Sequence, residues 1–329
     1  MLTQTWTDIL EICQRCPSPH NVQPWKVSIN SGSSCTVYID NTRTLPKEDV
    51  TGSFILSGMA MYLEMMRYAA EICGYELSYE ITSKTLMYAE VLTAFAQVTI
   101  RPNPEVRPTY AKDIIYKRRT SRLGHTEVVI SDDIHKTLAS GVALFGHHYG
   151  HTEDANTIQH ILDRNVTALF EDLNKSTYHD EIVSWFRYSR WSSRAHHDGL
   201  DARCMQMNPA EYYLSAKIPQ IFKINVLSNL LRKRYLKILD QTSCFAWISG
   251  QFWEPDQAIE AGKLLIKFWL DLTEYDLYIH PFGNLITNQQ ARTFTESEIG
   301  VDNLWFVFRI GYTKTPPESY RRPIKEILI

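Results

Sequence analysis

Residues 116–122 read YKRRTSR and gather several groups that could hold an anion. Four cations fall within six residues, with two hydroxyl side chains between them: Lys117, Arg118, Arg119, Thr120, Ser121 and Arg122. A phosphate suits this set, because guanidinium groups form bidentate, charge-assisted hydrogen bonds while hydroxyls and helix-terminal amides take the remaining oxygens. The alternative interpretation is a solvated basic turn. A second basic stretch, Tyr320–Pro323, contains Arg321 and Arg322.

A second candidate element, PSPHNVQPW at residues 17–25, carries more specific polar chemistry than a turn requires. Its polar side chains lie among prolines: Ser18, His20, Asn21 and Gln23. Because a proline disfavours helix in the residue before it, the stretch is expected to follow the end of a helix. Trp25 is expected to pack beneath this loop, with direct ligand contact as the minority interpretation.

Hydrophobic spacing predicts the elements that must position these two stretches. Apolar residues recur every three or four positions in 6–16, 52–74 and 258–275, which indicates amphipathic helices, and 132–170 is a further helical region. Apolar alternation or continuous apolar runs predict strands at KVSI, CTVYID, ELSYEI, VLTAFAQVTI, DLYIH and LWFVFRIGY. The order helix, strand, strand therefore occurs twice. This repeated order favours two related α+β halves that share a core, at 1–112 and 113–329.

The segment 176–217, within the second half, lacks a clean period and mixes aromatic with polar residues. Its aromatic side chains include Trp185, Phe186, Tyr188 and Trp191. This composition is typical of a covering segment, so we consider it a candidate lid. An ordinary helical hairpin with a half-exposed aromatic face is the alternative.

Composition and charge exclude several classes of protein. The 329 residues are 44% hydrophobic and 22% charged, as in a folded globular protein larger than one typical domain. A net charge of −3 offers no bulk attraction to nucleic acid or to an anionic membrane. No apolar run is long enough to cross a bilayer, and MLTQTWTDIL lacks the features of a signal peptide. We therefore expect a cytoplasmic protein without nucleic-acid or membrane partners.

The six cysteines are scattered and are expected to be free, mostly buried thiols. Cys13 and Cys16 form a C-x-x-C, but no strand-turn-helix pattern precedes it, so redox or metal duty is not expected.

The histidine clusters do not predict a metal site. Three histidines in HHYGH, at 147, 148 and 151, could bind a metal from a helix, but Gly146 and Gly150 favour a loop. We find no carboxylate or cysteine spaced to complete that site. The run His196–Asp198 is expected to face solvent or to make pH-responsive contacts.

Taken together, these motifs resemble the FMN-dependent nitroreductase superfamily. The likeness lies in P-S-x-x-N-x-Q-P-W after the first helix, an R-R-[ST]-x-R-like run, a helix of the A-G-x-x-L type, a strand ending R-x-G-Y, and a terminal R-R-P. The resemblance implies the α+β nitroreductase-type fold and a bound FMN. It also implies four groups of FMN-binding residues: Ser18, His20, Asn21 and Gln23 facing the isoalloxazine ring; Arg118, Arg119, Thr120 and Arg122 at the phosphate and ribityl chain; Pro281, Phe282 and Gly283 beside the flavin; and Arg321 as the cation of the tail.

The chain departs from the family pattern in length and in motif order. Ordinary members are shorter dimers that carry the arginine run before the Pro-Ser loop, with sites at the subunit interface. Here the loop comes first and each motif occurs once. The resemblance is therefore to a fused, lidded, flavin-sequestering branch: two unequal tandem copies forming an intrachain pseudo-dimer. One FMN per chain is expected, and a monomer suffices to build the site.

The activity that the resemblance implies is hydride transfer from NAD(P)H, through flavin N5, to a small electrophile such as a nitroaromatic or a quinone. No catalytic side chain is expected of the protein, because the flavin carries the chemistry. The alternative is a non-catalytic protein that sequesters or stores FMN beneath the lid. A structural protein with a decayed flavin site is a third interpretation.

Overall fold

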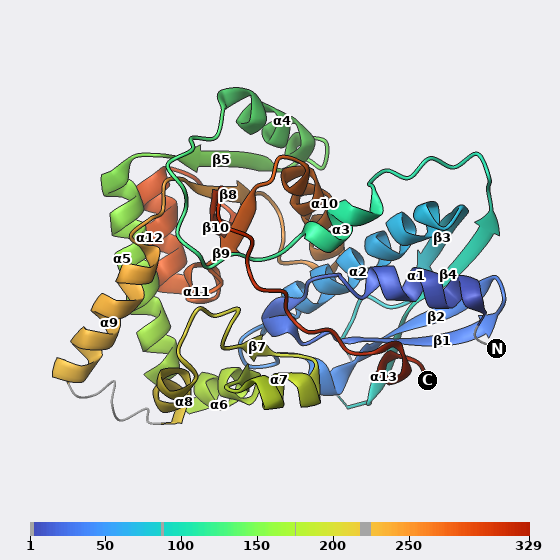
Figure 1. Cartoon of the computed structure of the whole chain (residues 1–329), viewed down its shortest axis with the longest axis horizontal. Coiled ribbons are helices and arrows are strands. Elements are labelled where there is room, and N and C mark those ends of the chain that lie inside the picture. Colours follow the sequence, from blue (N-terminus) through green and yellow to red (C-terminus); the bar gives the residue numbers. More distant parts are fainter. Residues whose placement is uncertain (1–2, 87–88, 175, 218–224) are drawn as a thin grey trace.

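The computed structural model describes residues 3–86, 89–174, 176–217 and 225–329, and its two four-stranded sheets stand at opposite ends of a shared helical core (Figure 1). All pairings within these two sheets are antiparallel. The predicted α+β class is confirmed. None of the described helices combines the length and apolarity needed to span a bilayer.

The first sheet has the strand order β1-β2-β4-β3 and confirms the strands predicted before residue 103. Its elements are α1 (Gln4–Cys13), β1 (Trp25–Ser31), β2 (Ser34–Asp40), α2 (Ser53–Ile72), β3 (Tyr75–Ile81) and β4 (Leu92–Pro102). A two-residue turn at Gly32 and Ser33 joins β1 to β2, as in a tight hairpin. Along β4, buried residues alternate with exposed ones, because one face of this sheet meets the core and the other meets solvent.

The second sheet has the order β5-β8-β10-β9 and contains two strands that the sequence analysis missed, β5 and β8. Its strands and flanking helices are α4 (Asp132–Ala143), β5 (His148–Thr152), α5 (Ala155–Asn174), β8 (Phe245–Ser249), α10 (Pro255–Glu274), β9 (Tyr278–Pro281), α11 (Asn284–Thr287), α12 (Gln289–Ile299) and β10 (Leu304–Gly311). Every residue of β8 and β10 is buried, so these strands show no outward alternation.

The expectation of a loop at HHYGH is wrong, because this segment is the edge strand β5. Gly146 does make a turn, with a φ of 74°. Gly150 instead lies in the strand against the ring of Trp247, where a Cβ would overlap the indole. The glycine is thus explained by close packing rather than by a loop.

The shared core forms where the long helices α2 and α10 pack against each other. Both helices are 20 residues long and carry apolar residues on most of their surface. Gly262 of α10 lies against Ser57 of α2, and a Cβ there would overlap the Ser57 backbone. Close contact between α2 and α10 therefore depends on this glycine. Trp25 is fully buried and stacks on Tyr62 with 4.3 Å between ring centroids, which confirms its packing role.

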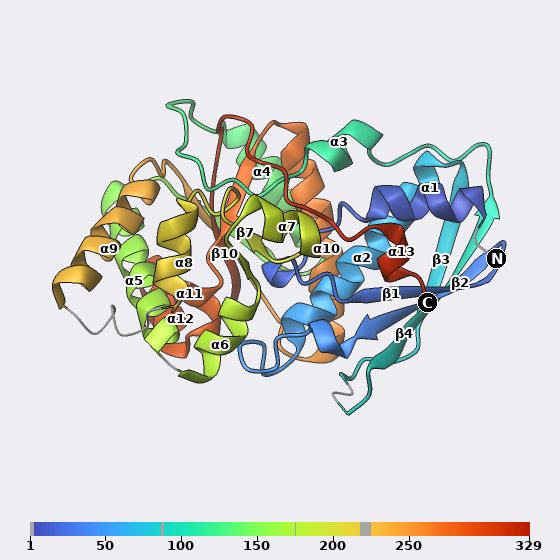
Figure 2. The same cartoon turned by 60° about the horizontal axis from the view of Figure 1, so that its bottom comes forward.

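The remaining helices and short strands lie outside the two four-stranded sheets, in the connecting segments and the tail. They comprise α3 (Lys112–Lys117), α6 (Ser176–Ser184), β6 (Phe186–Arg187), α7 (Arg190–His196), β7 (Leu200–Asp201), α8 (Pro209–Lys217), α9 (Asn225–Leu239) and α13 (Ile324–Ile327). Figures 1 and 2 place α6, α7 and α8 together on one side of the molecule. After β10 the chain returns to the first half, where Leu328 pairs with Val27 of β1.

Candidate functional site

A cavity of about 410 Å³ collects the segments that the sequence analysis singled out. All but one of the predicted binding residues line it: Ser18, His20, Asn21, Arg118, Arg119, Thr120, Arg122, Pro281, Phe282, Gly283 and Arg321. The exception is Gln23. The volume lies in the range of about 300–1,000 Å³ that is typical of small-molecule and cofactor sites.

Arg118, which is buried, and Arg321, which is half-buried, bring two positive charges to this cavity. Burial, and next the charge of Arg321, lowers the pKa of Arg118 to about 9. Burial, and next the charge of Arg15, lowers the pKa of Arg321 to about 10. In the described ranges neither guanidinium forms an ion pair with a carboxylate. Their protein contacts are with neutral acceptors, so the charges are hydrogen-bonded but not neutralised.

The contacts of Arg118 hold it in place without using all of its donors. Its Nη2 donates to the carbonyl of Arg15 at 3.0 Å, and its guanidinium lies 4.8 Å from the ring centroid of Trp269. Its Nε is buried and finds no hydrogen-bond partner among the described residues. Arg321 donates from Nε to the carbonyl of Cys16 at 3.2 Å. The free Nε–H leaves the cluster able to bind an acceptor.

The rest of the arginine run follows the edge of the second sheet. Thr120 forms a parallel bridge with Ile279 of β9, which fixes the run beside the strand that ends at Pro281. Arg119 donates to the carbonyl of Pro316 and pairs with Glu318 at 3.4 Å. Arg122 donates to the carbonyl of Cys204 at 3.2 Å, and burial lowers its pKa.

The loop at 17–25 holds an unusual backbone conformation. His20, Asn21 and Gln23 have φ values of 47°, 56° and 53°, in the left-handed region that non-glycine residues avoid. Such strain persists where surrounding contacts enforce it, and it clusters at functional sites. Here the Oγ of Ser18 accepts from the amide of Gln23 at 2.9 Å. Asn21 donates from Nδ2 to the carbonyls of Gly199 and Tyr320, both at 3.2 Å.

Gln23 holds the loop in place from outside the cavity. Its Nε2 donates to the carbonyl of His197 at 2.9 Å, and its Oε1 accepts from the amide of Arg322 at 2.8 Å. The side chain therefore connects the loop, the candidate lid and the tail. This position supports a structural role, while direct cofactor contact stays a prediction.

His280 is a cavity residue that the sequence analysis did not select. It ends the run DLYIH, and its Nδ1 is buried without a hydrogen-bond partner in the described part of the chain. Burial, then the charges of Arg122 and Arg309, holds its pKa well below the ordinary value. The imidazole is therefore neutral at physiological pH. In the sequence, only its position directly before Pro281 could have indicated that His280 belongs to the site.

Residues of the segment 176–217 line the same cavity, including Phe186, Leu200 and Tyr212. The segment is anchored to the first half by Asp198, which pairs with Arg43. The same carboxylate accepts from Arg187 Nε at 2.8 Å. Asp198 is buried, so the expectation that it faces solvent is wrong for this residue. A second contact joins Glu181 to the backbone amides of residues 47 and 48 at 2.9–3.2 Å.

Neither cysteine of the C-x-x-C lines this cavity. All six cysteines are free, and Cys13 and Cys16 are fully buried. Burial raises the pKa of Cys13 to about 12, which makes an unreactive thiol.

Comparison with known proteins gives similarity only to solved structures. No protein-family description matches the sequence, and no curated protein matches it. The chain is similar to the FMN-dependent nitroreductase NfnB of Mycobacterium smegmatis in complex with NADPH: 14% identity, 65% of this chain, 95% of that chain, TM-score 0.39. A nitroreductase with bound FMN from Bacteroides fragilis gives 12% identity, 64% and 92% coverage and a TM-score of 0.36. A BluB-like flavoprotein from Clostridium difficile gives 10% identity, coverage of 66% of this chain and 96% of that chain, and a TM-score of 0.37.

Proposed function

We propose that the chain binds one FMN in the cavity between its halves and acts as an NAD(P)H-dependent oxidoreductase of nitroreductase type. The observation that carries this proposal is a pair of arginines, the buried Arg118 and the half-buried Arg321, that line one cavity without a carboxylate partner among the described residues. Leaving such charges uncompensated costs several kcal/mol. An anion with several oxygens, such as the phosphate of FMN, would neutralise them.

The cavity residues fit the remaining parts of this cofactor. Several residues that line it have buried polar atoms without a hydrogen-bond partner in the described ranges, among them Asn21 Oδ1 and His280 Nδ1. Both suit polar groups of a ring, and much of the lining is apolar. When bound, FMN supplies hydride transfer between NAD(P)H and an acceptor. The chain's own residues hold the phosphate, orient the ring and exclude water.

We further propose that the site is shared by two unequal nitroreductase-like halves, 1–112 and 113–329. The loop at 17–25 belongs to the first half, whereas the arginine run and residues 281–283 belong to the second. Arg321 lies in the second half but reaches the first through the tail. A single chain thus supplies every proposed FMN contact, so a monomer suffices. The proposed acceptor is a small electrophile, such as a nitroaromatic or a quinone.

The test is FMN affinity in matched variants of neighbouring cations. Arg118→Ala should weaken FMN binding by roughly 30-fold or more, because a buried charge-assisted contact is worth about 2–5 kcal/mol. Lys117→Ala is the control: Lys117 lies in the same run but pairs with Asp276, outside the cavity. It should leave affinity within about twofold. Equal FMN affinity in both variants would contradict the proposal. The double variant Arg118→Ala, Arg122→Ala, with flavin content and melting temperature both unchanged, would support a decayed site.

A second candidate function is flavin sequestration without turnover, favoured by the position of the segment 176–217 along the cavity. Its anchors at Asp198 and Glu181 would hold it closed over the bound cofactor. Anaerobic addition of NADPH distinguishes the two functions. Bleaching of the flavin band in the intact protein supports the enzyme. Bleaching only after proteolytic cleavage within 176–217, with flavin still bound, supports sequestration.

A further inference from the structure

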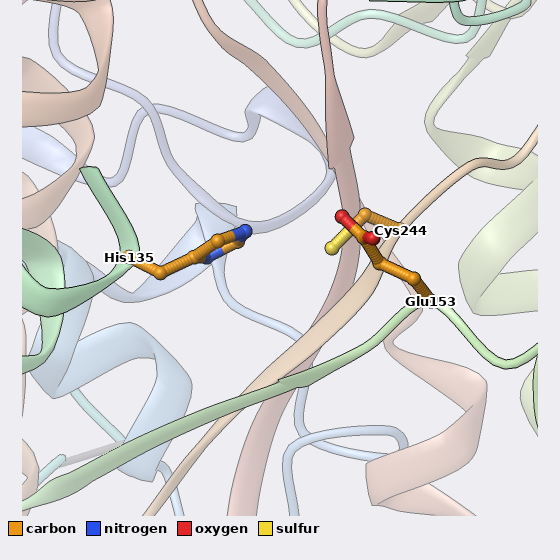
Figure 3. Close-up of side chains that lie close together, drawn as sticks. All are labelled: His135, Glu153 and Cys244. Atoms are coloured by element: carbon orange, nitrogen blue, oxygen red, sulfur yellow. The ribbon is translucent and has the colours of Figure 1, made fainter. Parts of the chain in front are cut away.

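Three potential metal ligands from separate elements meet at the edge of the second sheet. His135 comes from α4, Glu153 follows β5 and Cys244 precedes β8. One ligand atom from each lies within 4.8 Å of the others. Figure 3 shows the imidazole of His135 pointing toward Cys244 and Glu153, which approach it from the other side. None of the three lines the proposed FMN cavity.

The strand register explains how Glu153 and Cys244 become neighbours. Thr152 of β5 pairs with Phe245 of β8 in an antiparallel ladder, so the residue after Thr152 lies beside the residue before Phe245. The helix α4 packs on β5 and brings His135 to the same place. Ligands separated by up to 109 positions in the chain are thus placed together by the fold, which is why sequence spacing did not reveal them.

The state of His135 points to a missing ligand. Its side chain is 4% exposed, and its Nε2 is buried without a hydrogen-bond partner in the described part of the chain. Its Nδ1 lies 2.9 Å from the hydroxyl of Tyr149. When Nδ1–H donates to that oxygen, Nε2 keeps its lone pair free. Metal-binding histidines are commonly oriented in this way by a partner on the other ring nitrogen.

We propose that His135 Nε2, Cys244 Sγ and the Glu153 carboxylate bind a zinc-type divalent cation. Thiolate, imidazole and carboxylate are all ligands that Zn²⁺ accepts, and three protein ligands leave a fourth position for water. Binding releases the thiol proton of Cys244 to solvent. Tetrahedral ligation places ligand atoms roughly 3.5 Å apart. A small movement of the exposed Glu153 side chain would therefore complete the site with the buried His135 and Cys244. The bound ion would connect α4 and the edge strand β5 to β8.

The test is titration of the chelator-treated full chain with Co²⁺ and then Zn²⁺. We expect one Co²⁺ per chain, a thiolate-to-cobalt charge-transfer band, and loss of that band when one Zn²⁺ is added. Cys244→Ser should abolish the band. Cys73→Ser is the matched control, because Cys73 ends α2 in the first half and is only partly buried. It should keep the band.

Glu153→Gln makes the test independent of folding defects, because this side chain is exposed. It should weaken Co²⁺ binding by at least about tenfold, because loss of a partner that only orients a metal ligand already costs about 10–100-fold in affinity. Absence of binding in the unmodified chain would overturn the proposal. An unchanged band in Cys244→Ser, or unchanged affinity in Glu153→Gln, would also overturn it.

Discussion

The two sheets share an antiparallel architecture but differ in what covers them. In β4 of the first sheet, the residues facing away from the core are exposed, whereas β8 and β10 of the second sheet are buried on both faces. The second sheet packs on α10 with one face, and its other face meets a separate apolar cluster formed with α5, α11 and α12. The extra layer converts an outer surface into an interior, and residues of α5 and α11 in this layer also line the cavity.

The same difference appears in the histidines of the two halves. His20 is the only histidine before residue 113, and Glu48 and Glu181 raise its pKa against the opposing effect of burial. Four histidines of the second half have lowered pKa values, chiefly because of burial: His125, His135, His147 and His280. These four histidines are therefore neutral at physiological pH, and acid destabilises the fold by protonating them in the unfolded state.

The largest expected effect on stability comes from truncating a side chain on the outer face of a sheet, and it should differ between the two sheets. Phe245→Ala in β8 should lower the free energy of unfolding by about 3–5 kcal/mol, because it leaves a cavity among buried residues. Thr99→Ala in β4, on an exposed position, should lower it by less than about 1 kcal/mol. Urea denaturation measures both. Equal losses would show that the two outer faces do not differ in burial.

The second-largest expected effect on stability is that of acid on residues 113–329, through His125. Burial, then the charge of Arg309, lowers the pKa of His125 from 6.5 to about 3, so the folded state binds fewer protons than the unfolded state between these values. The neutral His125 side chain makes its full contribution to the free energy of unfolding above pH 6.5, and this contribution is lost as the pH falls toward 3. At pH 5 the loss is about 2 kcal/mol.

Urea denaturation at pH 7 and pH 5 measures this dependence. His125→Asn should reduce it, since Asn Oδ1 can accept the Ser243 amide that Nδ1 accepts at 3.2 Å. His148→Asn, at an exposed position of β5, is the control and should leave the pH dependence as it is. A His125→Asn protein that loses as much stability in acid as the unmodified chain would refute this assignment.

A smaller effect is expected at the contact between the covering segment and the first half. Glu181→Ala removes the acceptor for the amides of residues 47 and 48, a loss of about 1.5 kcal/mol for hydrogen bonds to a charged group. Local opening of 176–217 should become roughly tenfold more frequent, as measured by the rate of limited proteolysis. Asp180→Ala, at the neighbouring exposed position, should change that rate little. Identical rates would mean that Glu181 does not anchor the segment.

The smallest expected effect concerns His20, whose contribution to stability is lost as the pH rises, whereas that of His125 is lost as the pH falls. Because the pKa of His20 is raised above 6.5, its ion pair with Glu48 stabilises the fold fully below pH 6.5 and is lost as the pH rises through the raised value. His20→Gln should therefore lower the melting temperature of flavin-free protein more at pH 6 than at pH 8. The corresponding loss in the free energy of unfolding should be less than about 1 kcal/mol. A larger loss at pH 8 would reverse the sign and exclude this ion pair as the cause.

Much of the fold was predictable wherever burial is periodic. The helices α2 and α10 and the strands β1 to β4 follow from spacing, because a face that alternates between core and solvent leaves its period in the sequence. Both β8 and β10 are buried on both faces and have no such period; the 8 residues of β10 form an apolar run long enough to predict, whereas the 5 residues of β8 do not. The strand β5 was hidden by Gly150, which accommodates Trp247. A pattern shows that a residue is covered but not what covers it.

The sequence by itself determined the chemistry of the candidate site: an arginine run, a polar loop and a terminal cation, each of which residue types indicate. Only the tertiary structure brought Arg118 and Arg321, 203 positions apart, to one cavity and placed His280 and the segment 176–217 beside them. It also decided that Gln23 faces away and that His135, Glu153 and Cys244 meet. Residue types fix which bonds a group can form, whereas sheet order, register and helix packing decide which partners come within reach.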